Sequence, residues 1–110
     1  MKDNQVVTML ENVVLSEAGE VGPALDFGMF SKLGFNLLRH VAGAANSTIQ
    51  IQHAAVLNES AWVDLGDPFD LAGTTALAVN ETAFLRYIRF KVGTTEPSTA
   101  RVSLYVVAKE

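Results

Sequence analysis

Residues 84–92 read Phe-Leu-Arg-Tyr-Ile-Arg-Phe-Lys-Val, and apolar and basic side chains alternate in the second half of this stretch. Because successive side chains of an extended chain point to opposite sides, Ile88 and Phe90 share one side. Arg89 and Lys91 share the other side, and we expect both to point to water. A period of two predicts a β-strand of an antiparallel sheet that packs one side on a core.

Two further stretches predict the same kind of strand, because apolar residues recur in them at every second position. Residues 47–56 read Ser-Thr-Ile-Gln-Ile-Gln-His-Ala-Ala-Val, and residues 101–107 read Arg-Val-Ser-Leu-Tyr-Val-Val. Shorter β-prone runs accompany them, bounded by turn-forming Gly, Asn, Asp and Pro residues. These runs comprise residues 5–15, 24–27, 61–65 and 74–79. The clearest inward positions, which we expect in the core, are Ile51, Ile88, Phe90, Leu104 and Val106.

Residues 31–42, Ser-Lys-Leu-Gly-Phe-Asn-Leu-Leu-Arg-His-Val-Ala, fit two patterns. As a helix, the segment would begin with Ser31 as its cap and would place Leu33 and Leu37 on one face. As a strand, it would alternate apolar residues with Gly34 and other small or polar residues. A glycine in a helix interior costs about 1 kcal/mol, and the flanking segments are strands, so we favour a strand.

The pattern as a whole predicts an all-β fold, an antiparallel and jelly-roll-like β-sandwich of seven to eight strands. The 110 residues, with a mass of 11.8 kDa, suit a single sandwich domain over residues 1–110. Within it, residues 1–14 are predicted to form an N-terminal arm or an edge strand.

Composition excludes several kinds of function. The chain has no cysteine, which excludes disulfides, thiolate metal sites and cysteine nucleophiles. Eight Lys and Arg against twelve Asp and Glu give a net charge of −4, so we expect no contact with nucleic acid or with an anionic membrane. Polar residues interrupt the apolar run near the N-terminus, so we expect no export signal and synthesis in the cytoplasm.

The residues that could carry chemistry do not form a recognisable constellation. The histidines, His40 and His53, have no spacing that brings them to a third ligand, so we expect no metal site. Asp64, Asp67 and Asp70 lie close in sequence but lack the spacing of a calcium loop, which favours a turn with solvated acids. Nucleophile and phosphate-binding motifs are also missing, so we expect neither an enzyme nor a cofactor.

Apolar residues crowd the N-terminal segment and lead us to expect a protein interface there. Together with one aromatic residue, the predicted interface residues are Val6, Val7, Met9, Leu10, Val13 and Trp62. The Trp62 indole has two interpretations, a core or subunit contact, which we favour, or a platform that stacks on a sugar ring. Arg86, Arg89 and Arg101 could form a basic spot, although pairing with acids on the strand surfaces is the commoner arrangement.

Several pieces of the chain, in their order and spacing, resemble small β-sandwich proteins of tailed-bacteriophage virions. They are Ala-Leu-Asp-Phe-Gly at 24–28, Lys-Leu-Gly-Phe-Asn-Leu at 32–37, Ser-Thr-Ile-Gln-Ile-Gln at 47–52, Trp-Val-Asp-Leu-Gly at 62–66, Arg-Tyr-Ile-Arg-Phe-Lys-Val at 86–92, and the strand within 98–107. The similarity is greatest to capsid decoration, or cement, proteins. It spans roughly residues 20 to 108.

The resemblance implies a structural protein of the virion that binds the outer surface of a phage head and stabilises the shell by bridging capsid subunits. It implies the major capsid protein and copies of the chain itself as partners, most simply as a homotrimer. It implies no catalytic residues and no cofactor. Related sandwiches in phage tails and fibres bind carbohydrate, and a sugar-binding module is therefore the alternative function.

Overall fold

The computed structural model describes residues 5–94 and 99–110. These residues form nine β-strands and one short 3-10 helix, η1. The elements are β1 (Gln5–Leu15), β2 (Gly19–Asp26), β3 (Lys32–Val41), β4 (Thr48–Ala54), η1 (Glu59–Ala61), β5 (Val63–Asp64), β6 (Phe69–Asp70), β7 (Leu77–Glu81), β8 (Tyr87–Gly93) and β9 (Ala100–Lys109). None of the described segments is a helix long and apolar enough to cross a membrane.

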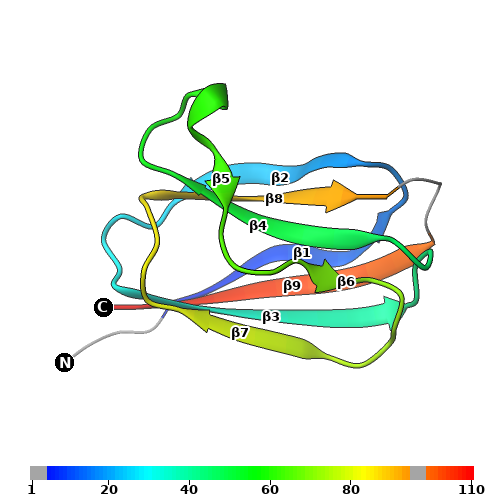
Figure 1. The fold of residues 1–110 in the computed structure, drawn as a ribbon. Helices are drawn as coiled ribbons and strands as arrows, with labels where there is room; N and C mark the ends of the chain where they lie inside the picture. Colours follow the sequence, from blue (N-terminus) through cyan, green and yellow to red (C-terminus); the bar gives the residue numbers. More distant parts are fainter. Residues whose placement is uncertain (1–4, 95–98) are drawn as a thin grey trace.

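The strands form two packed sheets, and every strand pair is antiparallel (Figure 1). Sheet A has the order β1-β9-β3-β7, and sheet B has the order β2-β8-β4-β5, with β6 also paired to β4. The chain crosses between the sheets at most of its connections, which is the jelly-roll arrangement. The predicted antiparallel, jelly-roll-like sandwich is confirmed.

Strand β4 is followed by two short strands in place of one longer strand, which raises the count above the predicted seven to eight. Gly66 separates β5 from β6 with a φ of 69°, a left-handed conformation that breaks a strand. Pro68 follows it and cannot donate a backbone hydrogen bond to a neighbouring strand. The fifth strand of the jelly roll is therefore interrupted.

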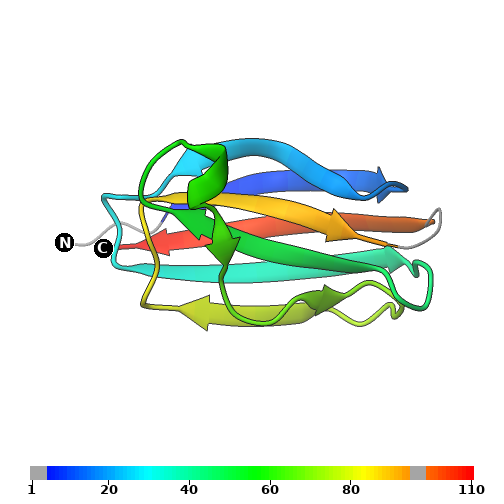
Figure 2. The ribbon, with the colours of Figure 1, turned by 45° about the horizontal axis from the view of Figure 1, so that its top comes forward.

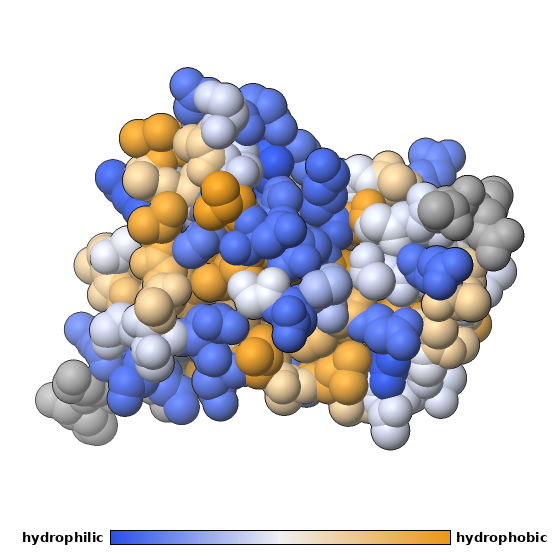
Figure 3. All heavy atoms as spheres, viewed as in Figure 1, coloured by the Kyte–Doolittle hydropathy of each residue, from blue (hydrophilic) through white to orange (hydrophobic). Residues whose placement is uncertain are grey.

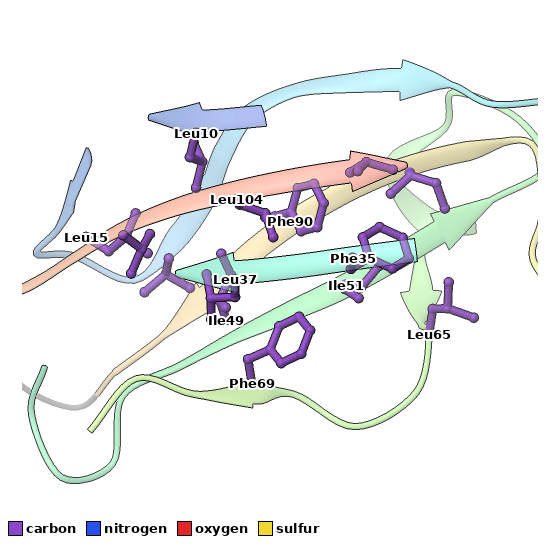
Figure 4. Packing of buried hydrophobic residues seen from close by; sticks show 14 of the residues in the cluster. Leu10, Leu15, Phe35, Leu37, Ile49, Ile51, Leu65, Phe69, Phe90 and Leu104 are labelled. Carbon is purple, nitrogen blue, oxygen red and sulfur yellow. The ribbon is translucent and has the colours of Figure 1, made fainter. Parts of the chain in front are cut away.

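Side chains from the inner faces of both sheets form one hydrophobic core (Figure 4). All five residues predicted for the core are buried there: Ile51, Ile88, Phe90, Leu104 and Val106. The rings of Phe35, from sheet A, and Phe90, from sheet B, meet edge to face with centroids 6.0 Å apart. This contact joins the two sheets at the centre of the sandwich.

The ambiguous segment is a strand, as favoured from the sequence. In β3, Leu33, Phe35 and Leu37 are buried on the inner side, and burial at every second position is the period of a strand and not of a helix. The strand pairs on both sides, with β7 and β9. Gly34 lies on its outer side, where an added Cβ would come within 3.0 Å of Asn80 Oδ1. Tertiary pairing therefore outweighs the local helical pattern.

Truncation of Phe90 to alanine tests the assignment of the strand faces. We expect the free energy of unfolding to fall by about 3–5 kcal/mol, because the ring is fully buried between the sheets. Denaturant-induced unfolding followed by circular dichroism measures this loss. The exposed neighbour Lys91, changed to alanine, is the control, with a change within about 0.5 kcal/mol. A loss below about 1 kcal/mol for Phe90→Ala would contradict the central position of the ring.

Candidate functional site

Three connections lie together at one end of the sandwich, those between β2 and β3, β4 and β5, and β7 and β8 (Figures 1 and 2). We call this surface, which comprises residues 27–31, 55–62 and 82–86 of the connections together with Val63 at the start of β5, the loop end. Most of the large hydrophobic side chains that are exposed among the described residues belong to it, namely Met29, Val56, Leu57, Val63 and Leu85. Figure 3 shows hydrophobic atoms gathered on this side, around the β4–β5 connection. Exposed apolar clusters of this kind typically mark interaction sites.

A pocket of about 390 Å³ lies between the β2–β3 and β7–β8 connections. Its apolar lining includes Met29, which is 89% exposed, and Leu85, which is 42% exposed. An ion pair lines its polar side, in which Arg86 Nη2 lies 2.8 Å from Asp26 Oδ2. Gly28 makes room for this pair, since a Cβ there would lie 2.9 Å from Arg86 Cγ. The pocket can therefore receive an apolar side chain of a partner beside a fixed ion pair.

The ion pair changes the acid–base properties of both partners. Hydrogen bonds from the Arg86 guanidinium and from the Gly28 N–H hold the pKa of the Asp26 carboxyl below its ordinary value of 3.8. The same contacts with Asp26 raise the pKa of Arg86. Both groups therefore stay charged over the whole neutral range, and the polar side of the pocket keeps its geometry.

A histidine holds the β7–β8 connection in place. The Leu85 N–H donates a hydrogen bond of 3.0 Å to His53 Nδ1, which fixes a neutral imidazole as the acceptor. Partial burial lowers the pKa of His53 below 6.5, and the nearby Glu81 carboxylate raises it by a smaller amount. The neutral imidazole is thus the form that the folded chain favours.

The expectation that Arg89 points to water is wrong. Arg89 does lie on the outer side of β8, but the β4–β5 connection covers it, and its side chain is only 8% exposed. Arg89 Nε donates to Gln52 Oε1 at 2.8 Å, and Nη1 lies 2.9 Å from Glu20 Oε1 and 3.1 Å from Glu59 Oε2. The guanidinium carbon lies 4.5 Å from the centroid of the Trp62 ring. These four partners and Arg89 form what we call the Arg89 cluster.

The Arg89 cluster anchors the β4–β5 connection to sheet B. Trp62 is half-buried over the guanidinium, so it makes an intramolecular cation–π contact rather than a core contact. Glu59, from η1, adds an ion pair to the same guanidinium. The cluster therefore fixes the connection that presents Val56 and Leu57, and it lines a second pocket of about 250 Å³.

The Arg89 cluster was not found from the sequence because its parts come from four separate segments. Gln52 in β4 and Arg89 in β8 are direct cross-strand partners, so their side chains lie on the same face of sheet B. That cross-strand pairing was the available signal. The position of Trp62 above them depends on the path of a loop, which alternation cannot predict.

The predicted interface residues lie in two places. In β1, Leu10 is buried in the sandwich's own core, and Val7, Met9 and Val13 pack against that core. Val6 is 67% exposed and points outward, whereas Trp62 belongs to the Arg89 cluster. The structure thus does not bring the predicted residues together into one patch, and their contact with a partner stays a prediction.

Most of the polar residues considered for metal binding have hydrogen-bond partners. His40 Nε2 lies 2.9 Å from Ser103 Oγ, Gln52 Nε2 donates to Asp64 Oδ1, and Asp70 Oδ1 accepts from the Ala72 N–H. Within the described parts of the chain, no three His, Asp or Glu side chains converge on one point.

Comparison of the sequence with protein-family models and with curated proteins finds no match. Among solved structures, the SPBc2 prophage-derived protein YomS is similar to the chain, with 16% sequence identity and a TM-score of 0.52. The match covers 100% of this chain and 96% of that one. PirA matches more loosely, with 13% identity, a TM-score of 0.36, and coverage of 99% and 84% of the two chains. At this identity, the likeness to YomS shows a shared fold alone.

Replacement of Arg89 by methionine tests the anchoring role of the cluster. We expect the free energy of unfolding to fall by about 1–3 kcal/mol, because buried Gln52 loses its charged donor. We also expect faster amide exchange in residues 55–62, measured by hydrogen exchange. Arg86→Met, at an exposed ion pair, is the matched control and leaves that exchange unchanged. Equal protection in Arg89→Met and in the wild type would contradict the anchoring.

The His53 contact predicts a pH dependence of stability. Because the pKa of His53 is lower in the folded chain than 6.5, the unfolded chain takes up the proton at a higher pH. The stability of the wild type relative to His53→Gln should therefore fall as the pH is lowered from 6.5 through the folded pKa. Unfolding curves at a series of pH values measure this difference. A difference that does not vary between pH 7 and pH 5 would contradict the lowered pKa.

Proposed function

We propose that this chain is a structural protein of a phage virion, and more specifically a capsid decoration protein that binds the outer surface of the head. The observation that carries the proposal is the exposed apolar loop end, held in shape by the Arg89 cluster and by His53. The shared fold with a prophage-derived protein is consistent with a phage structural protein. The order of sandwich segments in the sequence supports the narrower role.

The proposed mechanism is bridging. Each copy buries the loop end, and other surface, on neighbouring subunits of the major capsid protein, so that separating those subunits also breaks these contacts. A specific interface usually buries about 1,600 Å² in total, which one small domain can reach when its contacts are divided between subunits. Because the protein binds the assembled shell and not the free subunits, each bound copy stabilises the shell by mass action.

In this proposal the partners are the major capsid protein and copies of the chain itself, assembled as a homotrimer. The protein is made in the host cytoplasm and its final place is the outer capsid surface. The chain acts by binding and performs no catalysis.

Heads that lack the protein provide the test. We expect added protein to co-sediment with such heads and to raise the temperature at which they release DNA. The double variant Met29→Asp and Leu85→Asp should bind at least about tenfold more weakly, because a partner would have to desolvate two carboxylates. Ala45→Asp, an exposed alanine in the β3–β4 connection at the opposite end, is the matched control and should bind normally.

Two results would contradict the proposal. Bare heads that resist heat, chelator and low salt as well as decorated heads do would show that the protein does not cement the shell. Equal binding of the double variant and the control would show that the loop end is not the contact surface.

Carbohydrate binding is the second candidate, and the pocket beside the Arg89 cluster favours it. That pocket combines an aromatic ring, Trp62, with the exposed carboxylates of Glu20 and Glu59, which can accept hydrogen bonds from sugar hydroxyls. Binding of the purified protein to a glycan array, with no binding to bare heads, would replace the decoration role by this one.

A further inference from the structure

The outer face of sheet A, which we call the A face, has no charged side chain along its centre. Residues that lie directly opposite each other in antiparallel strands point to the same side of a sheet. One row across all four strands of this face consists of Val6, Val107, Gly34 and Asn80. Val6 is exposed, and the row is uncharged, with two valines, a glycine and the polar Asn80.

The next row of the A face is also uncharged, although three of its four residues are polar. It consists of Thr8, Tyr105, Asn36 and Ala78, and the partly buried Leu38 follows on β3. A sheet face that is permanently in water usually carries charged or strongly polar side chains at alternate positions. Two successive uncharged rows across four strands are instead typical of a face that another protein covers.

The A face also has a depression suited to a side chain from a partner. A pocket of about 190 Å³ opens on the A face over Gly34, Ala78, Asn80 and Val107. It exists because Gly34 has no side chain, and Lys109 is the charged residue in its lining. The depression adds shape to an otherwise flat surface.

The charges that the strand register places on the A face lie at its two ends and are basic. Lys32 and Lys109 are direct partners at one end, beside the loop end, and Arg101 is paired with Val14 at the other. Glu11 lies in the irregular stretch of the edge strand β1, between the registers of Leu10 and Val13. The basic ends and the uncharged central rows call for a partner with an uncharged centre and carboxylates near its perimeter.

The outer face of sheet B is different in charge. Strand pairing puts Glu20, Asp26 and Asp64 on that face together with Arg89 and Lys91. These three acidic and two basic residues sum to −1, whereas the charges that strand pairing puts at the ends of the A face, Lys32, Lys109 and Arg101, are all basic. The two outer faces are thus chemically distinct.

We propose that the A face is a docking surface for a subunit of the capsid shell, whose complementary surface is flat, uncharged at its centre and acidic at its edge. This inference rests on the proposed function and adds to it a second contact surface. The β2–β3 turn joins the A face to the loop end, since the Ser31 N–H donates to the Lys109 carbonyl at 2.9 Å. Two adjoining surfaces at an angle are what a bridge between two neighbouring subunits requires.

A second copy of the chain fits the A face less well. In aligned packing of two A faces, the basic ends of one copy would lie on the basic ends of the other, and like charges would repel. Nucleic acid fits poorly as well, because the centre of the face offers no cation to a phosphate. Charge therefore favours an acidic-edged protein surface.

The test measures binding to heads that lack the protein, by co-sedimentation. The double variant Thr8→Glu and Ala78→Glu puts two carboxylates in the uncharged row, and we expect binding at least tenfold weaker. Ala24→Glu, an exposed alanine on β2 of sheet B, is the matched control and should bind as the wild type does. Circular dichroism and unfolding curves verify that each variant is folded.

Charge reversal provides an independent readout. Lys32→Glu with Lys109→Glu should weaken binding and reduce its dependence on salt, whereas Lys91→Glu, on the other face, should change neither.

Three results would overturn the inference. If the wild type binds heads and the A-face variants bind equally well, the inference fails while the proposed function stands. If the wild type does not bind heads at all, the proposed function fails and takes the inference with it. If Thr8→Glu with Ala78→Glu converts an oligomer into a monomer in analytical ultracentrifugation but leaves binding to heads intact, the A face is an interface between copies of the chain.

Discussion

The rest of the structure depends on the burial of one side of β9. Every second residue of this strand, from Ala100 through Leu104 to Ala108, has no exposed surface, and the strand pairs along its length with β1 and β3. A shift of its register by one residue would put all of these side chains in water. The same constraint fixes which residues of β1, β3 and β7 point outward, so the uncharged outer surface of the sheet is determined by the core on its inner side.

The second organising contact is a charge that the fold removes from water. Arg89 is covered by Trp62 and satisfied by Gln52, Glu20 and Glu59, so its burial brings hydrogen bonds and ion pairs with it. A buried guanidinium without such partners would cost several kcal/mol. Because its partners come from β2, β4 and the β4–β5 connection, the cluster couples the position of an exposed apolar loop to the register of sheet B.

Alternation along the chain was sufficient to predict the strands and the core, because a period of two is a local property. It can be recognised from the few residues on either side of Ile88 or Leu104. It was also sufficient for β3, where Gly34 disfavoured the competing helix. It could not predict that Arg89 would be covered, since the cover comes from a distant loop. The apolar residues of β1 were expected at an interface, but Leu10 is in the core of its own sandwich, because sequence cannot separate the two uses of an apolar side chain.

The connections make the two ends of the molecule different, because both proposed contact surfaces meet at only one of them. Strand β1 begins and β9 ends beside the loop end, whereas the β3–β4 connection, residues 42–47, lies at the opposite end (Figure 1). A peptide fused after Lys109 would emerge next to both proposed contact surfaces and obstruct them. A peptide inserted near Ala45, which is exposed, would instead extend away from both proposed surfaces, so this connection is the position at which an added sequence leaves them free.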